Sequence, residues 1–154
     1  MLYMEDVYEI PEQPYFGAFR GRYSQADLRE LDAYAQDLGI ELVPCVQTLA
    51  HLNQFFQWEH INSQYADLAD VLHVGREETY TLIDQMLASL SSCFTTKRIH
   101  LGMDEAYDLG RGHYLDQVGL RAKTDIMLDH LARIKTLCDR YDLEPIIWDD
   151  ICLL

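Results

Sequence analysis

The sequence predicts an α/β fold made of parallel strand–helix–strand units, because short apolar runs of strand length alternate with segments of helical periodicity. The segments that follow the strands are long and rich in polar residues, whereas those that follow the helices contain only two or three residues. Functional residues at the carboxyl ends of the strands are typical of both (β/α)8 barrels and open α/β sheets. No glycine-rich phosphate-binding loop follows any of the strands, which disfavours a nucleotide-binding sheet.

The elements are expected to alternate along the chain. Four strands are predicted at residues 2–8, 41–46, 98–102 and 144–148. The first helix is predicted to begin after Ser24, which can cap it with Asp27 as the acidic partner, and to end at Gly39. Two further helices are predicted at about residues 77–90 and 125–141. Each has one apolar face, formed by Tyr80, Ile83, Leu87 and Leu90 in the first and by Met127, Leu131, Ile134, Cys138 and Tyr141 in the second.

The composition limits the classes of partner. The 154 residues contain 26 Asp and Glu against 12 Lys and Arg, for a formal net charge of −14. This charge repels phosphate backbones, so we expect no nucleic-acid partner. No apolar run approaches the roughly 20 residues of a membrane helix, and the first residues lack the pattern of a secretory signal. We therefore expect no membrane partner and a cytoplasmic chain with one domain over residues 1–154.

The four cysteines are too widely spaced for a zinc site and too few for a disulfide framework. They are Cys45, Cys93, Cys138 and Cys152. We expect free, mostly buried thiols, which fits a reducing compartment.

Each predicted strand brings polar or aromatic side chains to its carboxyl end. These are Glu5, Asp6 and Tyr8 for the first strand, Gln47 and His51 for the second, His100, Asp104 and Glu105 for the third, and Trp148, Asp149 and Asp150 for the fourth. Among these residues, the adjacent Asp104 and Glu105 are the strongest indication of a catalytic site. One carboxylate can be held ionised by hydrogen bonds while the other keeps its proton in a drier setting and acts as a general acid.

Structural roles explain the same residues. A pair of loop-capping acids accounts for Asp104 and Glu105 on spacing alone, and His51 fits an ordinary loop histidine. Trp148 fits either the core or a flat platform for a sugar ring. A metal site built from histidines and carboxylates is a further alternative, but no His-x-x-x-His or facial-triad spacing supports it, and we expect no metal.

Four stretches have the order and spacing of a known family. They read LYMED at 2–6, VPCVQTLAHL at 43–52, HLGMDE at 100–105 and IIWDD at 146–150. Together they resemble the catalytic barrel of family 20 glycoside hydrolases, the β-N-acetylhexosaminidases, and most closely the bacterial N-acetylglucosaminidase branch that includes the hexosaminidase D type. The Gly-x-Asp-Glu element is the specific part. The resemblance implies about half of a (β/α)8 barrel, roughly its strands two to five.

The resemblance implies a retaining, exo-acting hydrolase of terminal β-linked N-acetylhexosamines that uses no enzyme nucleophile and no cofactor. The 2-acetamido oxygen of the substrate attacks the anomeric carbon. Glu105 would protonate the leaving oxygen and later deprotonate water, while Asp104 would hold the acetamido N–H and stabilise its developing charge. His51 would be a polar neighbour of this pair, and Trp148 a wall of the sugar pocket. Asp6 and Asp149 complete the expected substrate-binding residues.

The sequence departs from the family in supplying four strands of the eight. The arginine of the family's first strand would lie before Met1, and the tyrosine partner of the acetamido group would lie after Leu154. Three hypotheses follow: a truncated hexosaminidase catalytic domain, a non-catalytic half-barrel with at most weak sugar binding, and a metal-dependent hydrolase. A four-stranded half-barrel has two open edges, so we also expect a homodimer or larger assembly, with the tail 151–154 covered in the interface.

Overall fold

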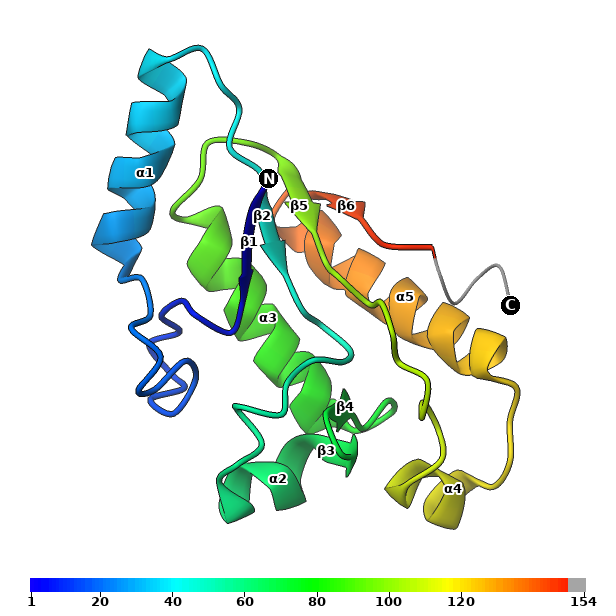
Figure 1. Cartoon of the computed structure of the whole chain (residues 1–154). Coiled ribbons are helices and arrows are strands. Elements are labelled where there is room, and N and C mark those ends of the chain that lie inside the picture. The colour runs from blue at the N-terminus through cyan, green and yellow to red at the C-terminus, as the bar shows by residue number, and fades with distance from the viewer. Residues whose placement is uncertain (150–154) are drawn as a thin grey trace.

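A four-stranded parallel sheet forms the centre of the protein (Figure 1). The computed structural model describes residues 1–149. The strands are β1 (Leu2–Glu5), β2 (Pro44–Val46), β5 (Arg98–His100) and β6 (Glu144–Ile146), and they lie in the order β1-β2-β5-β6. All neighbouring pairs are parallel, which confirms the predicted topology. The strands are shorter than predicted, because the chain leaves the sheet at Glu5 and Ile146 instead of continuing to Tyr8 and Trp148.

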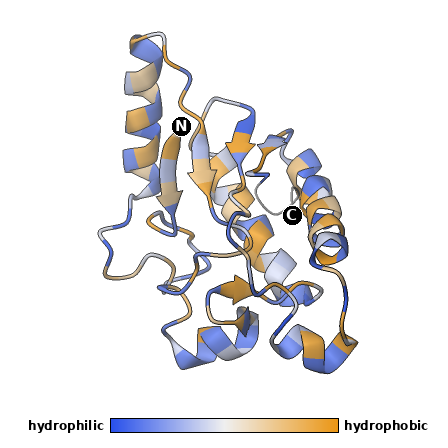
Figure 2. Ribbon diagram, turned by 45° about the vertical axis from the view of Figure 1, so that its right-hand side comes forward, coloured by the Kyte–Doolittle hydropathy of each residue, from blue (hydrophilic) through white to orange (hydrophobic). Residues whose placement is uncertain are grey.

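Three helices connect the strands and cover one face of the sheet. They are α1 (Gln25–Asp37), α3 (Glu77–Ser91) and α5 (Lys123–Arg140), close to the predicted ranges. Because the strands lie in chain order and parallel crossovers are right-handed, successive helices fall on the same side. Apolar and polar residues alternate along β1 and β5, and the helices have apolar and polar faces (Figure 2). The main core lies between these helices and the sheet.

The caps of α1 follow the predicted pattern. The Ser24 side chain accepts a hydrogen bond from the backbone N–H of Asp27, and the Asp27 carboxylate accepts one from the backbone N–H of Ser24. Past the helix end, Gly39 has φ +70°, a left-handed conformation that glycine adopts without a side-chain clash. Reciprocal capping bonds and a terminal glycine define α1 locally, which explains why its bounds could be read from the sequence.

Two loops contain small elements that the sequence did not predict. The segment after β2 forms α2 (Glu59–Tyr65) and the antiparallel pair β3 (Ala66–Leu68) and β4 (Val71–Leu72), and the segment after β5 forms α4 (His113–Val118). They are two to seven residues long, which is too short for a periodic apolar pattern. Neither helix has a side-chain cap at its N-terminus. These loops lie beyond the carboxyl ends of β1, β2 and β5 (Figure 1).

The buried face of α5 contains a histidine that the predicted apolar stripe omitted. His130 has no exposed surface, while Leu131 of the predicted stripe is only half-buried. Burial lowers the pKa of His130 to about 4, so the ring is neutral. Its Nε2 donates to the Thr48 carbonyl at 2.9 Å, and its Nδ1 accepts from the Tyr80 hydroxyl at 3.1 Å. One ring therefore ties α5 and α3 to the end of β2.

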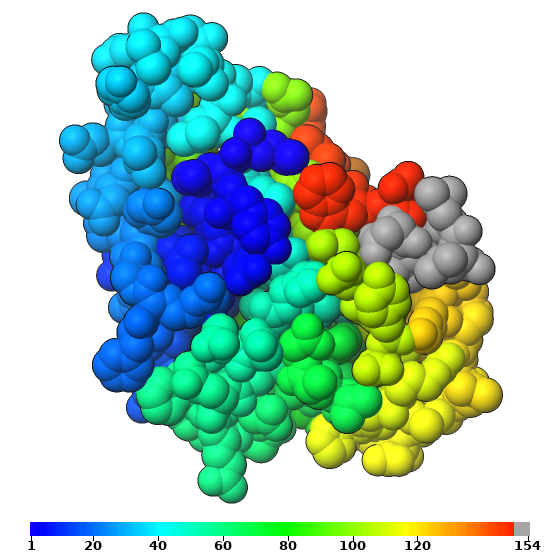
Figure 3. All heavy atoms as spheres, viewed as in Figure 1, coloured from blue at the N-terminus to red at the C-terminus, as the bar shows by residue number. Residues whose placement is uncertain are grey.

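The two outer strands each have one neighbour within residues 1–149, so β1 and β6 present open edges. Figure 3 views the sheet from the side opposite α3 and shows segments of β1 and β6 at the surface. Three of the cysteines, Cys45, Cys93 and Cys138, are free and buried, as predicted, and Cys152 lies outside the described residues. None of the helices in this part of the chain is long and apolar enough to cross a membrane. The tail 151–154 also lies outside the described residues.

The low pKa of His130 predicts a pH-dependent stability. The unfolded ring takes up a proton near its ordinary pKa of 6.5, whereas the folded ring does so only near 4. The unfolded state therefore binds more protons between these values, and the free energy of unfolding should fall by about 1–3 kcal/mol as the pH drops from 6.5 to 4. Urea unfolding at a series of pH values measures this slope.

Two variants isolate this contribution. His130→Gln keeps a donor for Thr48 and an acceptor for Tyr80 but does not titrate, so its stability should fall less over the same range. The exposed His113→Gln should keep the wild-type slope. Equal slopes in wild type and His130→Gln would contradict the assignment.

Candidate active site

The carboxyl ends of three strands hold non-glycine residues in a left-handed backbone conformation. Seven such residues occur in the described chain, and four of them lie here: Glu5 after β1, His51 after β2, and Met103 and Glu105 after β5, with φ between 50° and 73°. Each costs of order 1–3 kcal/mol and persists only where the surrounding structure fixes it. This concentration of strain marks the strand ends as a candidate functional site.

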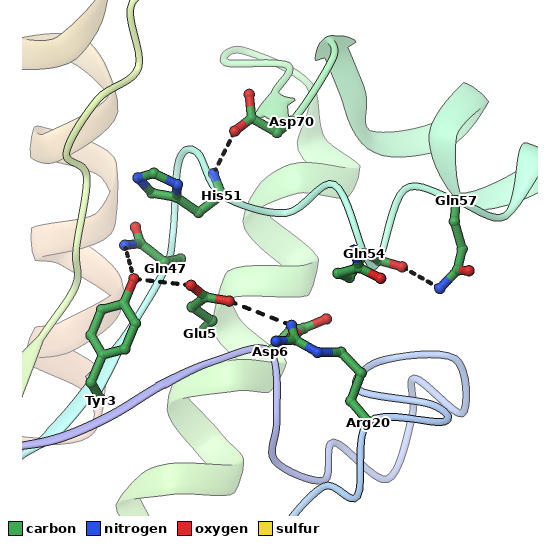
Figure 4. A network of polar contacts seen from close by, with 9 residues as sticks. All are labelled: Tyr3, Glu5, Asp6, Arg20, Gln47, His51, Gln54, Gln57 and Asp70. Atoms are coloured by element: carbon green, nitrogen blue, oxygen red, sulfur yellow. Dashed lines mark hydrogen bonds and ion pairs between the residues drawn. The ribbon is translucent and has the colours of Figure 1, made fainter.

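The end of β1 contributes a buried carboxylate that is paired with an arginine. Asp6 is 1% exposed and forms an ion pair with Arg20, which also contacts Glu5 at 3.4 Å (Figure 4). Burial raises the pKa of Asp6 above its ordinary value, while the Arg20 charge acts in the opposite direction. Arg20 reaches back from the loop after β1, so this loop is fastened to the strand end.

The end of β2 contributes an amide that connects three parts of the site. The Gln47 side chain is fully buried. Its Nε2 donates to Asp104 Oδ1 at 2.9 Å and to the Tyr3 hydroxyl at 3.3 Å, and its Oε1 accepts from the backbone N–H of Met103 at 3.2 Å. The Tyr3 hydroxyl in turn donates to Glu5 at 3.2 Å (Figure 4). The amide thereby sets the orientation of Asp104 and joins the ends of β1, β2 and β5.

His51 lies against both members of the carboxylate pair. Its Nε2 is 3.5 Å from Asp104 Oδ2 and 3.7 Å from Glu105 Oε2. The backbone N–H of His51 donates to Asp70 Oδ2 at 3.1 Å, and Asp70 lies in the turn between β3 and β4 (Figure 4). The small hairpin therefore positions the histidine. The imidazole ring of His51 is therefore a polar neighbour of both carboxylates.

The two carboxylates occupy different environments. The Asp104 side chain is 23% exposed and receives the Gln47 hydrogen bond, whereas the Glu105 side chain is 56% exposed. The hydrogen-bonded setting expected for one member is therefore present at Asp104. The drier setting expected for the other is not formed around Glu105 by residues 1–149. The same feature leaves Glu105 accessible to a substrate.

The end of β5 and the segment after β6 meet in a contact between two tilted rings. The rings of His100 and Trp148 lie 4.3 Å apart, and His100 Nδ1 accepts from the backbone N–H of Gly102 at 3.1 Å. Burial lowers the pKa of His100, so its ring is neutral. Trp148 remains 39% exposed and lies against His100. In the sheet, His100 is paired with Cys45, which is paired in turn with Tyr3. Tyr3 and Trp148 are therefore the exposed aromatic residues on this face, whereas Cys45 and His100 are buried.

The structure brings some of the predicted site residues together and leaves others apart. His51, Asp104 and Glu105 form one cluster, and Asp6 is connected to it through Arg20, Glu5, Tyr3 and Gln47. Asp149 is exposed at the end of the described chain, and Asp150 lies outside it. No three histidine, cysteine, aspartate or glutamate side chains within residues 1–149 are grouped to hold a metal ion.

Sequence reasoning did not single out Tyr3 or Arg20. Tyr3 lies within β1, where alternation assigns it only to a face of the strand. Arg20 lies in a loop fourteen residues after Asp6, and no local pattern pairs the two. Glycines such as Gly17 and Gly21 near Arg20 are typical of a turn, but only the folded loop shows that this turn brings Arg20 back to Asp6.

The comparison with protein families identifies the family to which the chain belongs. The model described as glycosyl hydrolase family 20, catalytic domain, matches residues 6–153. The chain belongs to glycosyl hydrolase family 20. This confirms the resemblance drawn from the strand-end residues. Among curated relatives, hexosaminidase D of Bos taurus is 27% identical over 139 residues, which cover 84% of this chain and 40% of that protein. The chain thus spans about two fifths of its length.

Solved structures of family 20 members show the same fold. The β-N-acetylhexosaminidase of Bacteroides fragilis superimposes with a TM-score of 0.78 at 21% identity, covering 99% of this chain and 35% of that one. The exo β-N-acetylglucosaminidase of Vibrio harveyi, solved with N-acetylglucosamine, gives a TM-score of 0.79 at 15% identity, covering 95% and 29%. These matches confirm that the sheet and its helices are part of an α/β barrel.

Close packing at Gly102 predicts a sharp effect of one added methyl group. A Cβ at Gly102 would lie 2.5 Å from Gln47 Cδ and 2.6 Å from the Val46 carbonyl oxygen. Gly102→Ala should therefore lower the free energy of unfolding by about 2–5 kcal/mol, through backbone strain and overpacking together. Urea denaturation measures the loss.

Gly39→Ala is the matched control for this prediction. Gly39 has nearly the same backbone angle, φ +70° against +71°, but a Cβ there would meet nothing within 4 Å. It should therefore lose only about 1–2 kcal/mol from the left-handed backbone. Equal losses in the two variants would show that Gly102 is chosen for its φ angle and not for the approach of Gln47.

Proposed function

We propose that this family 20 chain carries the general acid and the acetamido-binding aspartate of a retaining, substrate-assisted β-N-acetylhexosaminidase. The observation that carries the proposal is the cluster of Asp104, Glu105 and His51 at the strand ends, with Asp104 held by the buried Gln47. Membership of the family and the likeness to a protein named hexosaminidase D support it. The substrate class is a terminal β-linked N-acetylhexosamine.

Each residue has a distinct task in the proposed reaction. Glu105 donates a proton to the leaving glycosidic oxygen and later takes one from water. Asp104 accepts the acetamido N–H, which directs the acetamido oxygen towards the anomeric carbon and offsets the positive charge that develops on the ring formed there. Gln47 keeps Asp104 in a fixed rotamer through its 2.9 Å hydrogen bond, and His51 lies against both carboxylates and limits their movement.

The exposure of Glu105 sets the expected rate. The Glu105 side chain is 56% exposed, so the described residues do not enclose it. Positioning contributes much of a glycosidase's acceleration, because a displacement of about 1 Å can cost ~100-fold. We therefore expect hydrolysis by the isolated chain to be slow. A half-barrel that binds N-acetylhexosamine without turnover is the second candidate, and the exposed Glu105 favours it.

Loss of the acid gives the direct test. Glu105→Gln removes the acidic proton and should lower the hydrolysis rate of a chromogenic aryl β-N-acetylglucosaminide by about 100-fold or more. Asp104→Asn should also be severe, and should impair N-acetyl substrates more than substrates without the acetamido group. The assay follows release of the aryl alcohol by purified chain.

The double variant Glu105→Gln, Asp104→Asn serves as the control for contaminating enzymes. Activity that persists unchanged in it does not come from this chain. Equal activity of wild type and Glu105→Gln, above that of the double variant, would contradict the role of Glu105 as acid.

We also propose that two copies associate through the open sheet edges, with β1 of one copy beside β6 of the other. The two strands each have one neighbour in the described structure, and the copies together supply eight strands. Light scattering at micromolar concentration should give a mass near twice the chain mass of 17.9 kDa. A monodisperse monomer would contradict this assembly.

A further inference from the structure

A cavity of about 500 Å³ lies outside the candidate active site, between α3 and α5 and next to β4 and α4. Its lining residues come from these four elements and from the short segments beside them, and Asp104, Glu105 and His51 are not among them. β4 and α4 lie at the end of the molecule where α3 begins (Figure 1). All four elements belong to the described chain, so the described wall of the cavity needs no further strand of a barrel.

Three arginines line this cavity in a strongly acidic chain. Arg76 is the N-cap residue of α3, Arg121 precedes α5, and Arg133 lies within α5. They are three of the 12 basic residues in a chain with 26 acidic ones, whereas the described wall includes one carboxylate, that of Asp129. This local excess of positive charge favours an anionic ligand, because a small anion responds mainly to charges within about 10 Å.

Each of these arginines uses one terminal nitrogen in its contacts with the described chain. Arg121 donates from Nη1 to Asp129 at 2.7 Å, Arg133 donates from Nη2 to Glu77 at 2.8 Å, and Arg76 donates from Nη1 to two backbone carbonyls of α2. A guanidinium has five N–H donors on three nitrogens, so each retains donors outside these bonds. The Asp129 and Glu77 side chains are 58% and 81% exposed, so water weakens both pairs and an anion can share the guanidinium groups.

A buried histidine adds an unmatched acceptor to the same wall. His73 is 2% exposed, and its Nδ1 lies 3.1 Å from the Val74 carbonyl oxygen. Since a carbonyl can only accept, Nδ1 carries the proton and Nε2 presents a lone pair. Burial and the Arg76 charge lower the pKa of His73, and the weaker opposing effect of Asp67 does not reverse this. Nε2 has no hydrogen-bond partner within residues 1–149, so a ligand hydroxyl would satisfy it.

We propose that this cavity binds a small phosphomonoester that carries hydroxyl groups, such as a hexose phosphate. Its phosphate lies between Arg76, Arg121 and Arg133, and one of its hydroxyls donates to His73 Nε2. Three guanidinium groups match the three terminal oxygens of a phosphomonoester better than the two oxygens of a carboxylate. The volume falls within the range of small-molecule sites. The proposal goes beyond the glycosidase function and does not depend on it.

Titration calorimetry with the purified full chain at low ionic strength tests the site with three probes: glucose 6-phosphate, inorganic phosphate and glucose. Glucose 6-phosphate should bind saturably, inorganic phosphate at least fivefold more weakly, and glucose without saturation. Arg121→Gln and Arg133→Gln should each weaken glucose 6-phosphate binding about tenfold or more, because each removes charge-assisted hydrogen bonds to the phosphate.

Arg140→Gln is the matched control for the loss of charge. Arg140 lies on the same helix as Arg133, is 60% exposed, pairs with Asp84 and does not line this cavity. Its replacement should leave glucose 6-phosphate affinity within twofold. Equal weakening by Arg140→Gln and Arg121→Gln, equal affinities for glucose and glucose 6-phosphate, or no binding of any probe would overturn the proposal. Inorganic phosphate that binds as tightly as glucose 6-phosphate would show a site for the free anion and contradict the sugar phosphate.

The contact with His73 has its own measurement, which needs no variant in the core. In the ¹⁵N-labelled chain, the Nε2 resonance of His73 should shift when glucose 6-phosphate is added and stay in place with glucose. Binding without such a shift would contradict the hydroxyl contact. Glu105→Gln should bind glucose 6-phosphate like wild type, since Glu105 does not line the cavity. The outcome at this site therefore leaves the outcome of the hydrolysis assay open, and the reverse also holds.

Discussion

The arrangement of the site depends on the close approach of the ends of β2 and β5 at Gly102. Because Gly102 has no side chain, the Gln47 amide can pass over it and accept from the backbone N–H of Met103. The same amide then has its two amino hydrogens directed at Asp104 and Tyr3. A fully satisfied buried amide has few alternative rotamers, so the position of Asp104 follows from the packing of two strands. Without this approach, Asp104 would be an ordinary loop carboxylate.

The helices on the other side of the sheet support this close approach of the ends of β2 and β5. His130 joins Thr48, the residue after Gln47, to Tyr80 on α3, and the Arg133 guanidinium lies 3.4 Å from the centre of the Tyr80 ring. Thr48 also bonds to the Leu101 carbonyl through both its backbone N–H and its hydroxyl. The segment that carries the site residues of β2 is therefore held by α5, α3 and β5 together. Rigid support of this kind is what a site with several strained residues needs.

The loops at the carboxyl ends of the strands are well ordered by their own contacts, whereas the sheet face opposite the helices is only partly covered. The loops after β1 and β2 carry their own small elements and hold their polar groups through ion pairs and hydrogen bonds. The face of the sheet opposite the helices is less complete: Tyr3 and Trp148 are both substantially exposed there. In family 20 the parallel sheet is part of a barrel, and closure of a barrel covers such a face. The carboxylate pair is thus well positioned but poorly enclosed.

The sequence by itself determined the alternation of strands and helices, the caps of α1 and the strand ends that carry the polar residues. Those features depend on local patterns: apolar runs, the Ser24–Asp27 box, and a Gly-x-Asp-Glu element after a strand. Tertiary structure alone decided which groups meet. Periodicity placed Leu131 on the buried face of α5, but packing selected His130, because a neutral ring there satisfies both Thr48 and Tyr80. Arg20 returns to Asp6 for a similar reason: an ion pair joins two residues that are separated in sequence, and no local pattern specifies it.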